Sequence, residues 1–139
     1  MGIIYARIQL SNALRPDLHA VEIDALVDSG AVNLCIPEIV QRELGFESYE
    51  TRVVELADGS TRKVEVVEPV RVFFEGRRTT TVAMVLGSEV LLGAIPMQDM
   101  DVLIDPRSER LILPPDRPNF ALSKVKGVER NTARQFGDA

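Results

Sequence analysis

The chain has 139 residues, of which 45% are hydrophobic and 27% are charged, and its formal net charge is −5. This length favours one domain, and this composition is typical of a folded globular protein and argues against a disordered chain. The acidic balance argues against a nucleic-acid-binding protein, and no apolar run approaches the ~18 residues that a membrane span needs.

The first part of the chain alternates apolar and polar side chains, which is the pattern of β-strands. Strands are predicted over 2–10, 19–27 and 31–36, with turn residues at 11–17. The start, MGIIYARIQLSN, lacks a basic segment followed by a long apolar segment, so we expect no signal peptide.

A helix is predicted over 37–44. Pro37 suits the first helical position, Glu38 suits the positive end of the helix dipole, and Gly45 stands where a helix commonly ends. The apolar stripe of this helix is Ile39, Val40 and Leu44.

Hairpins are predicted beyond residue 51. The runs TRVVEL and RKVEVV flank Asp58-Gly59, and Asp-Gly between two alternating runs is the strongest short-range hairpin signal. A second turn is predicted at Glu75-Gly76. Further along, EVLLGAIPMQDMDVLID predicts a short apolar strand, a helical turn after Pro96 and another strand, and ERLIL ends the β-rich region near residue 113.

Many short strands at this spacing predict a mostly β sandwich or barrel, with one or two short helices. The domain is expected to span residues 1–126. Residues 127–139 are mainly polar and lack periodicity, so they are predicted to form a flexible C-terminal tail.

The single cysteine, Cys35, and the single histidine, His19, limit the chemistry of the chain. No disulfide can form within the chain, and two such ligands are too few for a zinc site. A cysteine nucleophile with a histidine base is not favoured, because Cys35 lies in an apolar run. We expect a cytoplasmic protein.

The remaining charged residues predict no further site. Asp99, Asp101 and Asp105 lack the spacing of a calcium loop and are interpreted as surface charges or caps. The basic residues are too few for a nucleic-acid stripe and are interpreted as solvated side chains; they are Arg77, Arg78, Lys124 and Lys126.

Four short segments follow one another in a specific order. An apolar strand runs into Asp28, a helix ends at Leu44-Gly45, a hairpin has glycine at its tip, and an apolar pair precedes another glycine. Besides Leu44-Gly45, the segments are Asp28-Ser29-Gly30-Ala31, the hairpin tip Leu56, Ala57, Asp58, Gly59 and Ser60, and the late segment Leu91, Leu92 and Gly93. Over roughly residues 20–113 this order resembles the retropepsin-like aspartic peptidase family, in its single-lobe bacterial and archaeal members.

The resemblance implies a retropepsin-like acid-protease barrel of one lobe that acts as a homodimeric aspartic endopeptidase. Each chain supplies one aspartate, so Asp28 would face Asp28 of the partner subunit across a two-fold axis. Two close carboxylates cannot both ionise cheaply, so the pair holds one proton. One carboxylate activates a water as general base, and the protonated one polarises the carbonyl of a peptide or protein substrate. The resemblance implies no cofactor, metal, nucleic acid or membrane partner.

The resemblance also gives roles to the residues around Asp28. The hydroxyl of Ser29, where the family more often has threonine, would form a hydrogen bond across the dimer. Gly30 would leave its backbone N–H accessible, and Ala31 completes the loop. The hairpin tip would close over the substrate as a flap, and the Leu-Leu-Gly segment would pack beneath the loop. The region 119–127 stands where family termini often pair into a dimer sheet.

Two alternatives to this interpretation stay open. Asp-Ser-Gly is common turn chemistry, so the chain would also fit a monomeric β-barrel without an active site. A fold does not determine a function, so the same domain would also fit a module that dimerises or binds a peptide without cleaving it. The chain also departs from the family pattern at Ala94-Ile95-Pro96-Met97, where many relatives have an Asp-x-Leu sequence.

Overall fold

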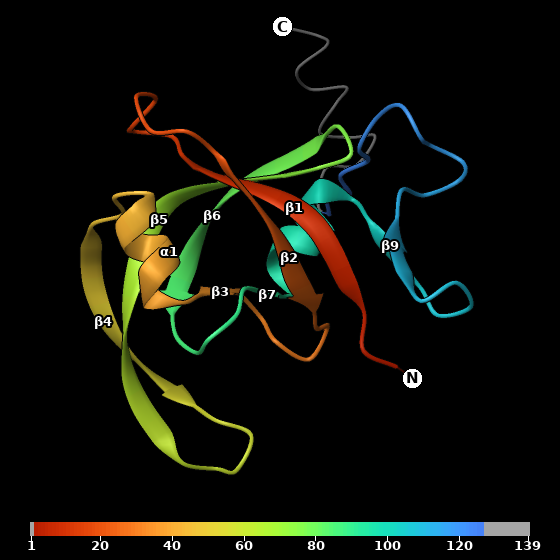
Figure 1. The fold of residues 1–139 in the computed structure, drawn as a ribbon. Coiled ribbons are helices and arrows are strands. Elements are labelled where there is room, and N and C mark those ends of the chain that lie inside the picture. The colour runs from red at the N-terminus through yellow and green to blue at the C-terminus, as the bar shows by residue number, and fades with distance from the viewer. Residues whose placement is uncertain (1, 127–139) are drawn as a thin grey trace, which may run out of the picture.

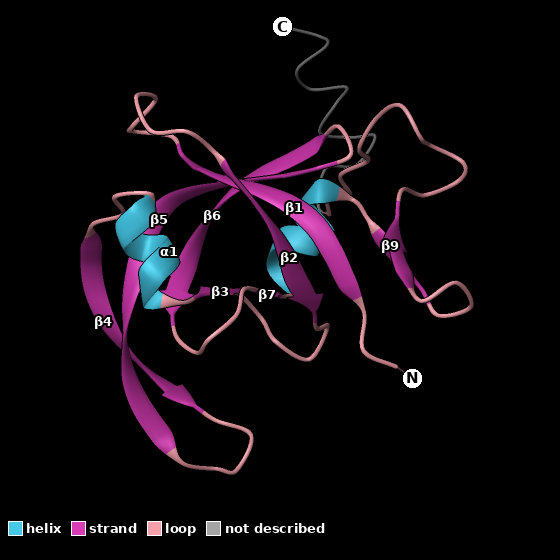
Figure 2. Ribbon diagram, viewed as in Figure 1, coloured by secondary structure: helices cyan, strands magenta, loops and turns pink. Residues whose placement is uncertain are grey.

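The computed structural model describes residues 2–126, and it confirms a mostly β protein with two short helices (Figure 2). The strands are β1 Tyr5–Asn12, β2 Val21–Val27, β3 Leu34–Ile36, β4 Ser48–Glu55, β5 Thr61–Phe74, β6 Arg77–Val85, β7 Leu91–Leu92, β8 Leu103–Asp105 and β9 Arg110–Ile112. The helices are α1 Glu38–Glu43 and α2 Ala94–Met100. The prediction of a flexible tail over 127–139 lies outside the described residues.

Six strands close into a barrel in the order β1, β2, β7, β3, β6 and β5, because β5 returns to pair with β1. The length of β5 makes this possible. Its first half, Thr61–Val67, pairs with β4, and its second half joins the barrel through Val70–Phe73. Within residues 2–126, β4 has β5 as its only strand partner, so the β4–β5 hairpin extends outside the closed ring (Figure 1).

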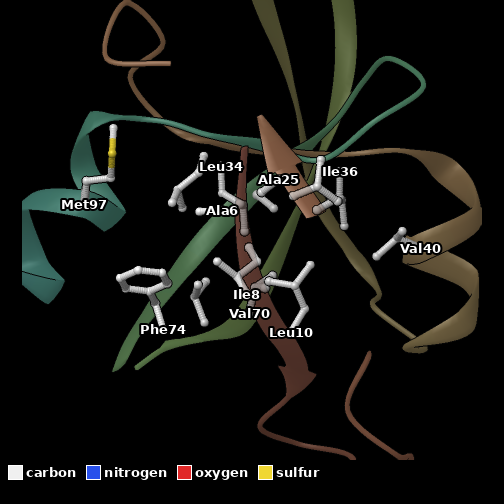
Figure 3. Packing of buried hydrophobic residues seen from close by; sticks show 14 of the residues in the cluster. Ala6, Ile8, Leu10, Ala25, Leu34, Ile36, Val40, Val70, Phe74 and Met97 are labelled. Atoms are coloured by element: carbon white, nitrogen blue, oxygen red, sulfur yellow. The ribbon is translucent and has the colours of Figure 1, made fainter. Parts of the chain in front are cut away.

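The core lies inside this barrel, and strand alternation builds it. Ala6, Ile8 and Leu10 of β1 point inward and are at most 5% exposed, while the residues between them face outward. Figure 3 shows these side chains packed between Val40 of α1 at one end and Met97 of α2 at the other. The two helices therefore cover the core at its two ends.

The helix predicted over 37–44 is confirmed as α1, with Pro37 as its N-cap residue instead of its first helical residue. Gly45 follows with φ +66°, the left-handed conformation that glycine adopts readily. Both predicted hairpin turns are also confirmed, at residues 56–60 and at Glu75-Gly76. Within residues 2–126, no helix is long and apolar enough to cross a membrane.

The interpretation of Arg77 as a solvated side chain is wrong. Arg77 is 5% exposed and donates hydrogen bonds to the carbonyl oxygens of Met100 at 3.1 Å, Asp101 at 2.9 Å and Arg117 at 2.5 Å. The tight turn before β6 brings Arg77 against the end of α2, a contact between distant segments that periodicity does not reveal. Its neighbour Arg78 is exposed, as expected of a solvated side chain.

Asp101, interpreted as a surface charge or a cap, is the C-cap residue of α2, and its side chain is only 11% exposed. Its carboxylate accepts hydrogen bonds from Nε and Nη2 of Arg117 at 2.6 and 2.9 Å, and from the backbone N–H of Leu122 at 2.8 Å. The Arg117 guanidinium, followed by the Leu122 N–H, lowers the pKa of Asp101 well below its usual range. We call Arg77, Asp101 and Arg117 the arginine clasp; it holds the chain after β9 against α2. Residues 119–126, the described part of the predicted dimer strand, form no strand.

Replacing Arg77 with methionine should lower the free energy of unfolding by about 2 kcal/mol, because buried carbonyl groups lose their donor. Chemical denaturation followed by circular dichroism measures this change. The matched control is Arg78→Met on the exposed neighbour, which should change stability by less than about 0.5 kcal/mol. Equal effects of the two substitutions would contradict the structural role of the clasp.

Candidate active site

Asp28 lies at the end of β2, where three short strands meet. β7 pairs in parallel with β2, through Leu26 with Leu91 and Val27 with Leu92, and antiparallel with β3, through Cys35. The N–H of Asp28 donates to the carbonyl of Leu92 at 3.0 Å, which continues this pairing by one residue. The backbone of Asp28 is therefore held by the sheet, while the chain leaves the sheet immediately after it.

The loop after Asp28 is a turn stabilised by the aspartate itself. The N–H of Gly30 donates to Oδ1 of Asp28 at 2.9 Å, and the N–H of Ala31 donates to its carbonyl oxygen at 3.1 Å. The side chain of Asp28 is half-buried, and Ser29 and Gly30 are exposed. The predicted loop Asp28-Ser29-Gly30-Ala31 thus fixes one carboxylate oxygen and leaves the loop surface uncovered by residues 2–126.

Gly93 lets this loop pack directly on the start of α2. A Cβ atom at Gly93 would lie 2.2 Å from the carbonyl oxygen of Asn33 and 2.8 Å from that of Ala31. Next to this contact, the N–H groups of Ala94 and Ile95 donate to the carbonyls of Ala31 and Val32 at 2.8 and 2.9 Å. The second glycine of the motif is therefore required by a close backbone approach.

A cleft of about 840 Å³ joins the Asp28 loop to the β4–β5 hairpin. The loop contributes Asp28, Gly30, Ala31, Val32 and Asn33, and the hairpin contributes Arg52, Val53, Val54, Glu55, Leu56, Ala57 and Gly59. The other lining residues belong to β3, β6 and β7 or stand directly after β6: Cys35, Met84, Leu86 and Leu91. Most of the side chains that line the cleft as a whole are apolar.

Only some residues of the hairpin tip line this cleft. Leu56, Ala57 and Gly59 line it, whereas Asp58 and Ser60 do not. Asp58 instead holds the turn together, since its Oδ1 accepts the N–H of Ser60 at 2.9 Å and the Ser60 hydroxyl at 2.5 Å. The hydrogen bond from the Ser60 hydroxyl, followed by that from its N–H, lowers the pKa of Asp58.

The late segment contributes both to the core and to the cleft. Leu92 and Gly93 are buried beneath the loop, and Leu91 is half-buried and lines the cleft. The alternation of a strand explains this, because neighbouring side chains point to opposite faces. The same alternation turns Cys35 toward the cleft, between the buried Leu34 and Ile36.

The sequence interpretation missed the body of the hairpin as part of the site. Residues 52–55 line the cleft, although only the tip was predicted to do so. The available signal was the length of the two alternating runs that flank Asp58-Gly59. Strands of this length can line a cleft along their sides as well as at the turn. Among residues 2–126, no three or more His, Cys, Asp or Glu side chains gather in a way that could hold a metal ion.

A scan against models of protein families found no match, and a search of curated proteins found none.

Replacing Gly93 with alanine should lower the free energy of unfolding by about 3 kcal/mol, because the new Cβ would collide with backbone oxygens that cannot rotate away. The control is Gly76→Ala, where φ is +81° and no atom lies within 4 Å of the added Cβ. That substitution should cost only about 1 kcal/mol, the strain of a left-handed alanine. Denaturant unfolding compares the two, and a smaller loss for Gly93→Ala would contradict the close approach.

Alkylation of Cys35 should report on its position next to Asp28. Burial, and secondly the charge of Asp28, raises the pKa of the Cys35 thiol. At pH about 8 the thiolate fraction is therefore smaller than in free cysteine, and iodoacetamide should react several-fold more slowly. Asp28→Asn should increase the rate, and Asp24→Asn, an exposed change on the same strand, should leave it unchanged. Equal alkylation rates in the two variants would show that the charge of Asp28 does not affect the Cys35 thiol.

Proposed function

We propose that this chain is a retropepsin-like aspartic endopeptidase that works as a homodimer. The observation that carries the proposal is the position of Asp28. This carboxylate stands on a loop clamped to β7 and α2, and it lines a cleft shared with a long hairpin. A carboxylate fixed in such a cleft is suited to proton transfer with a bound water.

The second subunit supplies what one chain lacks. Peptide hydrolysis by carboxylates needs a base and an acid together, and two close carboxylates provide both by sharing one proton. Among the described residues that line this cleft, the only other carboxylate is Glu55, which belongs to the hairpin and not to the loop. A two-fold axis beside the exposed Ser29 and Gly30 would instead bring Asp28 of the partner subunit to the site.

The proposed reaction proceeds without a covalent intermediate. The ionised carboxylate removes a proton from water, whose oxygen attacks the carbonyl carbon of the peptide bond. The protonated carboxylate donates to the carbonyl oxygen and stabilises the tetrahedral intermediate, and the leaving nitrogen then receives a proton as the C–N bond breaks. The Gly30 N–H, 2.9 Å from Oδ1 of Asp28, keeps one carboxylate in a single orientation.

The shape of the cleft supports an extended peptide as the substrate. Residues 52–57 line it consecutively, so odd and even positions alike border it. When consecutive residues of a strand all border a cleft, the strand faces the cleft with its backbone edge and not with one of its two faces. Within residues 2–126, the outer edge of β4 has no strand partner. An extended peptide would pair its main chain with this edge, as added strands do.

Asp28→Asn should abolish cleavage of an unfolded protein or a peptide library, with a loss of about a thousandfold or more, because the amide can neither accept nor supply the proton. Activity of the unaltered protein should be highest under mildly acidic conditions, since the pair must hold one proton. Cleavage is followed by mass spectrometry. Asp24→Asn is the matched control, because Asp24 is exposed on the same strand.

Three outcomes would count against the proposal. Cleavage that persists in Asp28→Asn would remove the residue from catalysis. A species that sediments as a monomer at all accessible concentrations would exclude the paired carboxylates and favour a barrel in which Asp-Ser-Gly is only a turn. Peptide binding without hydrolysis, and without inhibition by a statine-type transition-state analogue, would favour the non-catalytic module.

A further inference from the structure

We propose that Arg52 selects substrates that carry a carboxylate several residues away from the cleaved bond. The inference rests on the proposed function, because it assigns a specificity to the same cleft. Arg52 belongs to β4 and lines the cleft, but it lies outside the hairpin tip, residues 56–60, to which the sequence analysis gave a role in the site.

The hairpin register places Arg52 on the face of the hairpin that carries Val64. In the β4–β5 pairing Arg52 lies directly opposite Val64, and directly opposite residues place their side chains on the same face. Val64 is 5% exposed, so this is the face that the hairpin turns toward the barrel. The Arg52 side chain keeps 43% of its surface exposed, which leaves guanidinium donors free for a ligand.

Arg52 is the only cation among the described residues that line the cleft. The other charged lining residues are Asp28 and Glu55, both acidic. A substrate carboxylate near either of these meets a like charge, whereas near Arg52 it meets a planar guanidinium that binds carboxylates with two parallel hydrogen bonds. The charges of the cleft therefore favour an acidic group at one place only.

The spacing along β4 sets where that acidic group falls. Arg52 and Leu56 are four residues apart, which is about 13 Å in a strand. Leu56 is part of the hairpin tip that shares the cleft with Asp28. A peptide paired along β4 would therefore place its carboxylate about three to five residues from the bond at Asp28.

Glu50 forms an ion pair with Arg52. Its Oε1 accepts a hydrogen bond from Nη2 of Arg52 at 2.7 Å, and the two side chains are 52% and 43% exposed. Exposed ion pairs of this kind are weak, so a substrate carboxylate can replace Glu50. Glu50 does not line the cleft, and its removal should therefore strengthen the preference for an acidic substrate instead of weakening it.

The first experiment compares two cleavable peptides that differ only in Glu or Gln at the predicted position. The unaltered enzyme should cleave the Glu peptide with a kcat/KM about threefold higher, mainly through KM. Arg52→Gln should remove this preference, Arg52→Glu should transfer it to a Lys peptide, and Glu50→Gln should increase it. Arg62→Gln is the matched control, because Arg62 is a cation of the same hairpin, opposite Val54, that does not line the cleft.

The carboxylate bound by Arg52 could come from a glutamate side chain or from the free C-terminus of a peptide, and a further comparison distinguishes these two sources. A peptide whose acidic group at this position is its own free C-terminus is compared with the same peptide as the amide. A preference that follows the free C-terminus but not an internal Glu would identify the end of a chain as the ligand, and one that follows both would identify any carboxylate. A Glu preference that is unchanged in Arg52→Gln would overturn the role of Arg52.

A second readout does not depend on cleavage. Cys35 is the single cysteine of the chain and lines the same cleft, so a bound peptide should protect it from alkylation. The Glu peptide should protect Cys35 at lower concentration than the Gln peptide, and Arg52→Gln should equalise them. If no peptide is cleaved but this difference is found, the proposed catalysis fails and the role of Arg52 stands. If cleavage depends on Asp28 but Arg52→Gln changes neither the cleavage preference nor the protection of Cys35, only the proposed selection by Arg52 fails.

Discussion

Gly93 leaves no room for a side chain between the start of α2 and the loop after Asp28, and the candidate site depends on that contact. The loop is short and polar, and by itself it would sample many conformations. Backbone hydrogen bonds on both sides of the contact, from Asp28 to Leu92 and from Ala94 to Ala31, restrict it to one. A carboxylate can be oriented only by a support of this stiffness, because a shift of about an ångström is enough to spoil the geometry of proton transfer.

The barrel and the β4–β5 hairpin have different roles in the structure. The closed ring of six strands buries the apolar residues and carries Asp28, whereas β4 stays outside the ring and exposes nearly its whole length. An exposed edge strand risks aggregation unless charged side chains accompany it, and β4 carries Glu50, Arg52 and Glu55. The outer edge of β4, which has no strand partner within residues 2–126, is also the edge to which the proposed function assigns an extended peptide.

The arginine clasp stabilises α2 at the end that lies away from the Asp28 loop. Arg77 is buried, and it is tolerated because carbonyl oxygens of two segments and the carboxylate of Asp101 surround it. The clasp holds the C-terminal end of α2, and the Asp28 loop is hydrogen-bonded to its N-terminal end. The short helix is thereby held at both ends, which explains how seven residues with no side-chain cap remain helical.

The strands, the helix after Pro37, both hairpin turns and the place of Asp28 in a turn could be predicted from the sequence, because strand alternation and turn chemistry act over a few neighbouring residues. The position of β7 between β2 and β3, the burial of Arg77 and the orientation of Arg52 toward the cleft emerged only in the folded chain. Each of these depends on pairing between distant segments, such as Leu26 with Leu91 or Arg52 with Val64. Local pattern does not specify such pairings, since the partner is chosen by the packing of the whole barrel.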